Sequence, residues 1–103
     1  MHKYLFVIYG DSADTREARA AGMAEMAQWY KGLGQALIDP GAPFTGAKSV
    51  AQSGVQDGPI GPSASGYNLV QAVSLDAAAA LARACPLLEH GRQITVYETF
   101  SPS

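Results

Sequence analysis

The fold is decided by residues 65–100, which read SGYNLVQAVSLDAAAALARACPLLEHGRQITVYETF. Residues 67–73 alternate their side chains with a period of two, which predicts a strand. Ser74 is a favourable N-cap, and the small apolar residues after it predict a helix whose stripe can lie close to a sheet. The expected stripe consists of Ala77, Ala80, Leu81, Ala84 and Cys85. Pro86 ends this helix, and residues 92–100 alternate again as a last strand.

The N-terminal half begins with Lys3–Tyr9 (KYLFVIY), whose aromatic and β-branched residues predict a strand. Asp14 and Glu17 form a capping-box-like start, which predicts a helix after them. The apolar positions of this helix recur at three- and four-residue steps, at Met23, Met26, Tyr30, Leu33 and Leu37. Pro40 and Pro43 then remove backbone donors, so we expect the chain to turn there.

The middle of the chain is rich in glycine and proline. Residues 46–52 are short and only partly apolar, and we expect the second strand there, followed by a loop to about Gly66. The elements then follow one another as β-α-β-β-α-β, a ferredoxin-like α+β arrangement with strand order 4-1-3-2. Two helices cover one face of the antiparallel sheet in such an arrangement.

The other face of the sheet has no helix of its own. The first strand is nevertheless apolar on both sides, with Tyr4, Phe6 and Ile8 on one and Leu5, Val7 and Tyr9 on the other. We therefore expect a second copy of the chain to cover this face, which gives a homodimer of the dimeric α+β barrel type.

Composition excludes several classes of protein. The 103 residues suit a single domain spanning 1–103, and 48% of them are apolar, enough for a core. A net charge of −2 gives no positive field for nucleic acid. No stretch resembles an export signal or a membrane span, and the single Cys85 has no disulfide partner, so we expect a cytoplasmic protein. We expect Cys85 to be a small buried hydrophobe rather than a nucleophile.

Four segments carry a family resemblance: KYLFVIYG at residues 3–10, WYKGLGQALIDPGAPF at residues 29–44, DGP at residues 57–59, and the closing residues 65–100. They resemble the YCII-related family, also called DGPF-type proteins. The resemblance implies a dimeric α+β barrel with a cleft between helix, loop and sheet, and no assigned activity for most members. It also aligns Met23 with a proton-transferring His of better-known members, and Ile60 with the Phe of the DGPF motif.

Six side chains are candidates for a ligand site: Tyr9, Trp29, Asp39, Asp57, Tyr67 and His90. His90 lies in a turn and can act as a general base near neutral pH, although such a His is more often a solvated turn residue. Asp57 can present a carboxylate to a ligand, or its side chain can form a hydrogen bond with the backbone of its own turn. Trp29 is more simply a core anchor. Two histidines and one cysteine provide no metal-ligand spacing, so we expect no metal, and we expect no cofactor.

These features predict a protein that binds a small molecule in a cleft of a homodimer without catalysing a reaction. The alternative is a cofactor-independent enzyme, lyase- or oxygenase-like, that uses acid–base chemistry between an Asp and a His. We expect Asp57 and His90 to contribute to the ligand site without forming a catalytic pair.

Overall fold

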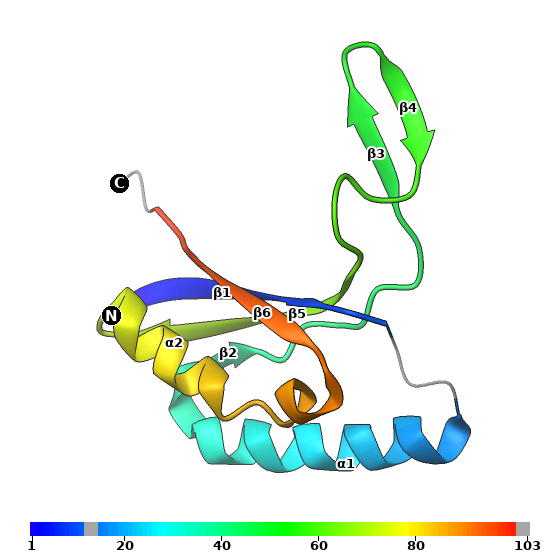
Figure 1. Ribbon diagram of the computed structural model, residues 1–103. Coiled ribbons are helices and arrows are strands. Elements are labelled where there is room, and N and C mark those ends of the chain that lie inside the picture. The colour runs from blue at the N-terminus through cyan, green and yellow to red at the C-terminus, as the bar shows by residue number, and fades with distance from the viewer. Residues whose placement is uncertain (12–14, 101–103) are drawn as a thin grey trace.

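The computed structural model describes residues 1–11 and 15–100 and has an α+β architecture (Figure 1). Its main sheet is antiparallel and contains β1 (His2–Tyr9), β2 (Leu37–Asp39), β5 (Ala64–Ala72) and β6 (Gln93–Glu98). Across the sheet the order is β2-β5-β1-β6, so that β2 and β6 form its two edges. Two helices, α1 (Arg16–Leu33) and α2 (Leu75–Arg83), lie on one side of this sheet. The arrangement is compatible with a ferredoxin-like fold.

The two central strands alternate between a buried and a half-buried face. On β1 the helix-side residues Tyr4, Phe6 and Ile8 are 0–4% exposed, because they pack beneath the helices. On β5 the helix side consists of Gly66, Asn68, Val70 and Ala72. The strands predicted at residues 3–9, 67–73 and 92–100 are confirmed, with ends shifted by up to three residues.

Helix α1 starts at Thr15, whose Oγ1 accepts a hydrogen bond from the Ala18 N–H at 3.1 Å. Asp14, the predicted cap, lies outside the described residues. The predicted apolar face is correct for three residues that pack on the core, namely Met26, Tyr30 and Leu33. It is wrong for Met23, which is 74% exposed, because the helix turns this position away from the sheet.

Helix α1 also ends earlier than its apolar spacing predicts. It stops at Leu33, because Gly34 takes a positive φ of 56° and its N–H bonds back to the Tyr30 carbonyl. A short 3₁₀ turn, η1 (Gly34–Ala36), follows. Leu37 was expected on the helix, but it opens β2 and reaches the core from the sheet edge.

Helix α2 begins as predicted at Ser74, whose Oγ accepts from the Ala77 N–H at 3.0 Å. The buried stripe differs from the expected one: it consists of Ala78, Ala82 and Cys85, while Ala80 and Ala84 are exposed. Four consecutive alanines make several stripes equally apolar, so only packing decides which of them is buried. A 3₁₀ turn, η2 (Pro86–His90), then leads to Gly91 and β6.

The strand expected at residues 46–52 is present, but not in the main sheet. Residues Lys48–Ala51 form β3, which pairs with β4 (Gly54–Asp57) in a separate two-stranded hairpin. The edge beside β5 is already occupied by β2. We call this hairpin the arm; it projects from the body on the side of the sheet opposite α1 (Figure 1). Within the described residues, no helix is long and apolar enough to cross a membrane.

Candidate functional site

The structure distributes the six candidate residues over different parts of the molecule. Tyr9 and Tyr67 lie on the face of the sheet that no helix covers, since they alternate with the buried residues of β1 and β5. Asp39 ends β2, Asp57 ends the arm, and His90 ends η2. Trp29 lies on α1, and its side chain is buried.

Trp29 is a core residue. Its ring stacks on Phe6 with centroids 6.2 Å apart, and its Nε1 donates to the Leu81 carbonyl at 3.3 Å. The side chain therefore joins α1 to both the sheet and the last turn of α2. At 8% exposure it has almost no surface left for a ligand.

The acidic and basic candidates each have a local partner. His90 Nε2 lies 3.2 Å from Glu25 Oε1 on α1, and both side chains are exposed. Asp57 pairs with Lys48 across the arm, and Asp39 accepts from the Gly41 N–H at 2.8 Å. Asp57 and His90 thus contact different residues.

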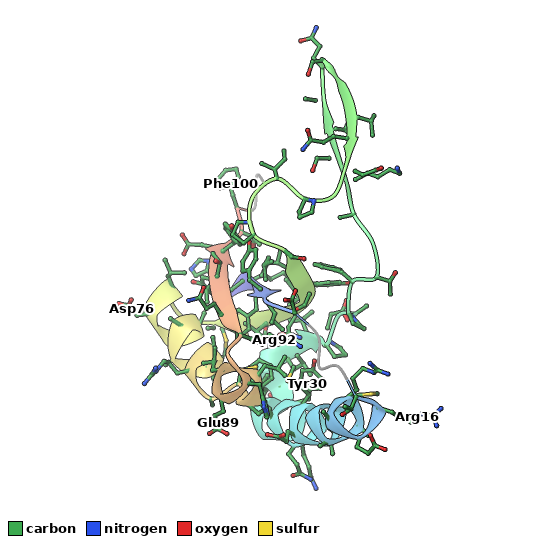
Figure 2. All side chains as sticks on the ribbon, turned by 45° about the vertical axis from the view of Figure 1, so that its right-hand side comes forward. Arg16, Tyr30, Asp76, Glu89, Arg92 and Phe100 are labelled. Atoms are coloured by element: carbon green, nitrogen blue, oxygen red, sulfur yellow. The ribbon has the colours of Figure 1, made fainter. Side chains whose placement is uncertain are left out.

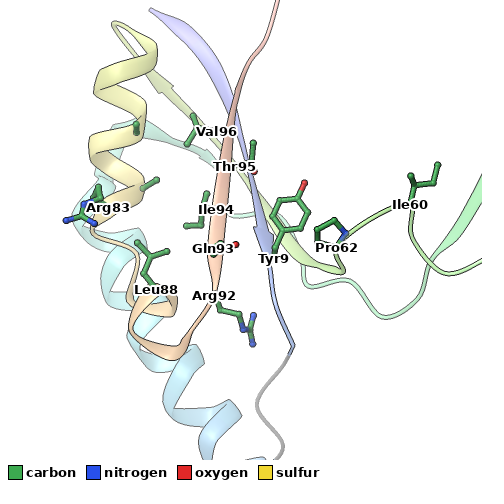
Figure 3. Close-up of a pocket in the computed structure, with 12 residues that line it drawn as sticks. Tyr9, Ile60, Pro62, Arg83, Leu88, Arg92, Gln93, Ile94, Thr95 and Val96 are labelled. Carbon is green, nitrogen blue, oxygen red and sulfur yellow. The ribbon is translucent and has the colours of Figure 1, made fainter.

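A hollow with a volume of about 720 Å³ follows the outer edge of β6 (Figure 3). We call it the β6 groove. Of the six candidates, only Tyr9 borders it. The other lining residues come from the loop after the arm, from α2, from η2 and from β6, and are Ile60, Pro62, Ala79, Ala82, Arg83, Leu88, Arg92, Gln93, Ile94, Thr95 and Val96.

The two sides of the β6 groove differ in polarity because side chains alternate along the strand. Ile94 and Val96 pair with helix-side residues of β1 and, with Leu88, form an apolar wall toward α2. Gln93 and Thr95 point to the uncovered face, as Tyr9 does. The groove therefore offers an apolar surface beside a polar one.

The backbone of β6 adds hydrogen-bonding groups to this groove. The Thr99 N–H donates to the Lys3 carbonyl at 3.1 Å, which marks these opposite residues as a bonded pair. Bonded and non-bonded pairs alternate in antiparallel sheets, so the N–H and C=O of Ile94 and Val96 point outward from the edge. They can bond to a ligand or to another strand.

Arg92 is held in a fixed position at one end of the groove. Its Nη1 donates to Ser65 Oγ at 2.9 Å, and Ser65 Oγ donates to the Ile8 carbonyl at 3.2 Å. Its Cδ lies against Gly10, where an added Cβ would approach to 2.7 Å; Gly10 also has a φ of 123°. Only glycine fits there, so the position of Arg92 depends on Gly10.

Arg83, on the last turn of α2, also borders the groove. Among the described residues two ion pairs form, Lys48 with Asp57 and Glu25 with His90, and neither includes Arg83 or Arg92. Sequence reasoning missed both arginines. They are the only Lys or Arg residues after Lys48, and that isolation within an apolar segment is the signal that could have found them.

The uncovered face of the sheet continues from the groove. It carries Leu5, Val7, Tyr9, Tyr67, Leu69, Thr95 and Tyr97. Phe44 stacks on Tyr67 with centroids 5.9 Å apart. The side chain of Tyr9 raises the pKa of the Tyr97 hydroxyl above its ordinary value of 10.0. The face therefore combines aliphatic with aromatic side chains.

Comparison with protein-family models and with curated proteins finds no match to this chain. Among the residues described, no three His, Cys, Asp or Glu side chains gather as metal ligands would.

Proposed function

We propose that the protein binds a small organic anion in the β6 groove and does not catalyse a reaction on it. The observation that carries this proposal is Arg92, a cation held by Ser65 and Gly10 beside an apolar wall and without a carboxylate partner in the described structure.

The chemistry of the groove fits such a ligand. A guanidinium bonds carboxylate or phosphate oxygens through a planar fork, and fixing it in advance lowers the entropic cost of binding. Leu88, Ile94 and Val96 would bury the apolar part of the ligand. A volume of about 720 Å³ lies within the range of small-molecule sites.

We further propose that the chain is a YCII-related protein whose ferredoxin-like domain forms a homodimer of the α+β barrel type. The family resemblance of residues 3–10, 29–44 and 65–100 supports this, as does the apolar uncovered face of β1. A second copy on that face would bury Leu5 and Val7.

The alternative, an acid–base enzyme, has less support. It needs an Asp and a His within reach of one substrate, whereas Asp57 pairs with Lys48 and His90 with Glu25. Neither Asp57 nor His90 lines the β6 groove.

A thermal-shift screen with apolar monocarboxylates and phosphate monoesters tests the binding proposal. A ligand of the folded state raises the melting temperature with the logarithm of its concentration. We expect a hit whose affinity falls at least about tenfold in both Arg83→Gln and Arg92→Gln. Arg16→Gln is the matched control, because Arg16 lies on α1 and does not line the groove.

Two results would contradict this proposal. One is that no anion of either class shifts the melting temperature. The other is that a hit binds the two groove variants as tightly as it binds the Arg16 control. Arg83→Gln also controls for stability, because the Arg83 side chain, unlike that of Arg92 on Ser65, makes no hydrogen bond within the described residues.

A further inference from the structure

The arm is a hairpin of two short strands that pair with each other and, within the described residues, with no other strand. Lys48 lies opposite Asp57, and Val50 lies opposite Val55, so these four side chains share one face. A two-stranded hairpin is marginally stable in water and needs further packing to persist. The body of the same chain does not supply that packing, because the arm projects away from it (Figures 1 and 2).

The arm also exposes apolar side chains. Val50 is 72% exposed, Val55 63%, and Ile60, in the loop that follows, 79%. All three border one hollow of about 250 Å³ along the arm. The opposite face carries Ser49 and Gln56, which suit contact with water. Val50 and Val55 therefore form an exposed apolar pair on one face of the arm, beside the Lys48–Asp57 ion pair.

The exposed surface area and the radius of gyration of this chain both exceed those of a compact monomer, which leaves surface that a partner could cover. A compact monomer of 10.8 kDa exposes about 5,500 Å², whereas this chain exposes 7240 Å². Its radius of gyration is 14.8 Å, against roughly 13 Å for a compact chain of this length. The excess area of roughly 1,700 Å² is about twice what each partner buries in a standard interface.

We propose that the arm clasps a second copy of this chain, with the Val50–Val55 face of each arm packed against the body of the other subunit. This inference rests on the proposed homodimer and adds the arm to its interface. The arm rises on the same side of the sheet as the uncovered face, so a copy docked on that face lies beside the arm (Figure 1).

Symmetry favours a second copy over an unrelated protein. Each chain carries both an unpacked arm and an uncovered sheet face. A two-fold axis lets two chains cover each other's surfaces at once, and the contact then closes at a dimer. The charges of Lys48 and Asp57 cancel on the arm, so the arm brings no net charge to the body of the other subunit.

Sedimentation velocity over a concentration series tests the inference with Val50→Asp and Val55→Asp. Each change places a charge on the arm face twice per dimer, so we expect the dimer dissociation constant to rise more than about 100-fold. Gln56→Asp is the matched control on the opposite face of the arm, and it should leave dimerisation unchanged. Because the arm stands apart from the body, both valine variants should keep the wild-type melting temperature at concentrations where all are monomers.

Amide hydrogen exchange over residues 48–57 supplies an independent measurement. We expect wild-type arm amides to become protected as protein concentration rises, and the Val50→Asp amides to stay unprotected. A wild-type monomer at all concentrations would overturn both the clasp and the homodimer. The clasp alone would be overturned if the chain dimerises but Val50→Asp and Val55→Asp change neither the dissociation constant nor the protection of the arm amides.

Discussion

Asn68 lies on the helix side of β5 and is 1% exposed, among apolar neighbours. Its Nδ2 donates to the Pro40 carbonyl at 2.9 Å and also contacts the Tyr30 hydroxyl at 3.1 Å. One amide thereby links β5 to the turn after β2 and to α1. Its Oδ1 has no protein partner among the described residues, so the nitrogen carries the structural role.

Replacing Asn68 by Ala should destabilise the protein by about 1–3 kcal/mol, because the hydrogen bonds that its buried amide makes to the Pro40 carbonyl and the Tyr30 hydroxyl are lost. Urea unfolding followed by tryptophan fluorescence measures the change. Gln71→Ala is the control: its amide donates to the Gln35 carbonyl at 2.8 Å in an exposed setting, where water replaces it. Equal losses in the two variants would contradict the role assigned to Asn68.

Cys85 is 2% exposed, which confirms the prediction that it is buried. Its Sγ lies 3.8 Å from Met26 Sδ. Burial raises the pKa of the thiol above its ordinary value of 9.0, an effect that outweighs the hydrogen bond from Leu87 and the charge of Arg92. The thiol should therefore react slowly with thiol reagents under native conditions.

The raised pKa of Cys85 also makes stability depend on alkaline pH. The folded state holds the thiol proton more tightly than the unfolded chain, so this stabilising contribution is complete below pH 9.0 and is lost as pH rises through the higher folded pKa. Burial raises the pKa of Tyr30 as well, so wild type must be compared with Cys85→Ala.

We expect wild type to lose more unfolding free energy than Cys85→Ala between about pH 8 and about pH 10.5. Urea unfolding at a series of pH values measures both curves. Parallel curves would mean that the thiol does not titrate differently on folding. Rapid stoichiometric labelling of native wild type would contradict its burial.

At the scale of single elements, α2 shows how closely a helix of small residues approaches the sheet. Ala78 is fully buried and packs in the same cluster as Tyr4, Phe6 and Val70. Further along α2, Trp29 Nε1 donates a hydrogen bond to the Leu81 carbonyl. No space for a larger side chain remains at position 78.

Ala78→Leu should destabilise the protein by about 1–3 kcal/mol, because the added carbons force the helix from the sheet. Ala80→Leu makes the same replacement of alanine by leucine, but on the exposed side of α2. It should therefore change stability by less than about 0.5 kcal/mol. Thermal unfolding of the two variants measures the difference. The opposite ranking would mean that the stripe with Ala80 faces the core.

At the scale of the whole molecule, the helices, the sheet and the arm form three successive levels (Figure 1). The helices bury one face of the sheet, while the arm and the uncovered face lie on the other side. Leu5 and Val7 are half-buried on this face by their neighbours alone. Both surfaces proposed for the dimer thus lie on one side of the molecule.

We expect Leu5→Glu and Val7→Glu to convert the proposed dimer to a monomer at micromolar concentration, because each would bury an unpaired charge twice per dimer. Light scattering after size-exclusion chromatography measures the mass. Met23→Glu is the control, since Met23 is exposed on α1 in the helix layer. A 10.8 kDa wild-type monomer, or a dimer indifferent to both changes, would contradict docking through this face.

Much of the fold was predictable from local patterns. Residues 67–73 and 92–100 alternate with a period of two, residues 3–9 are rich in aromatic and β-branched side chains, and Ser74 caps α2 as its side chain predicts. The candidate site was much less predictable: of the six residues proposed, only Tyr9 borders the β6 groove. Asp57 and His90 are polar turn residues whose neighbours come from the arm and from α1, and no spacing within their own segments specifies those neighbours.

The sequence by itself determined three strands of the main sheet, both helices and the N-cap of α2, because alternation, capping and turn chemistry act between residues a few positions apart. Only the tertiary structure decided that Leu37–Asp39 takes the sheet edge while residues 48–57 form an arm, and that Arg92 reaches the groove through Ser65. These outcomes depend on contacts between segments that are far apart in the sequence and that compete for the same place in the fold. The free energy of such contacts is summed over the whole fold and leaves no local pattern.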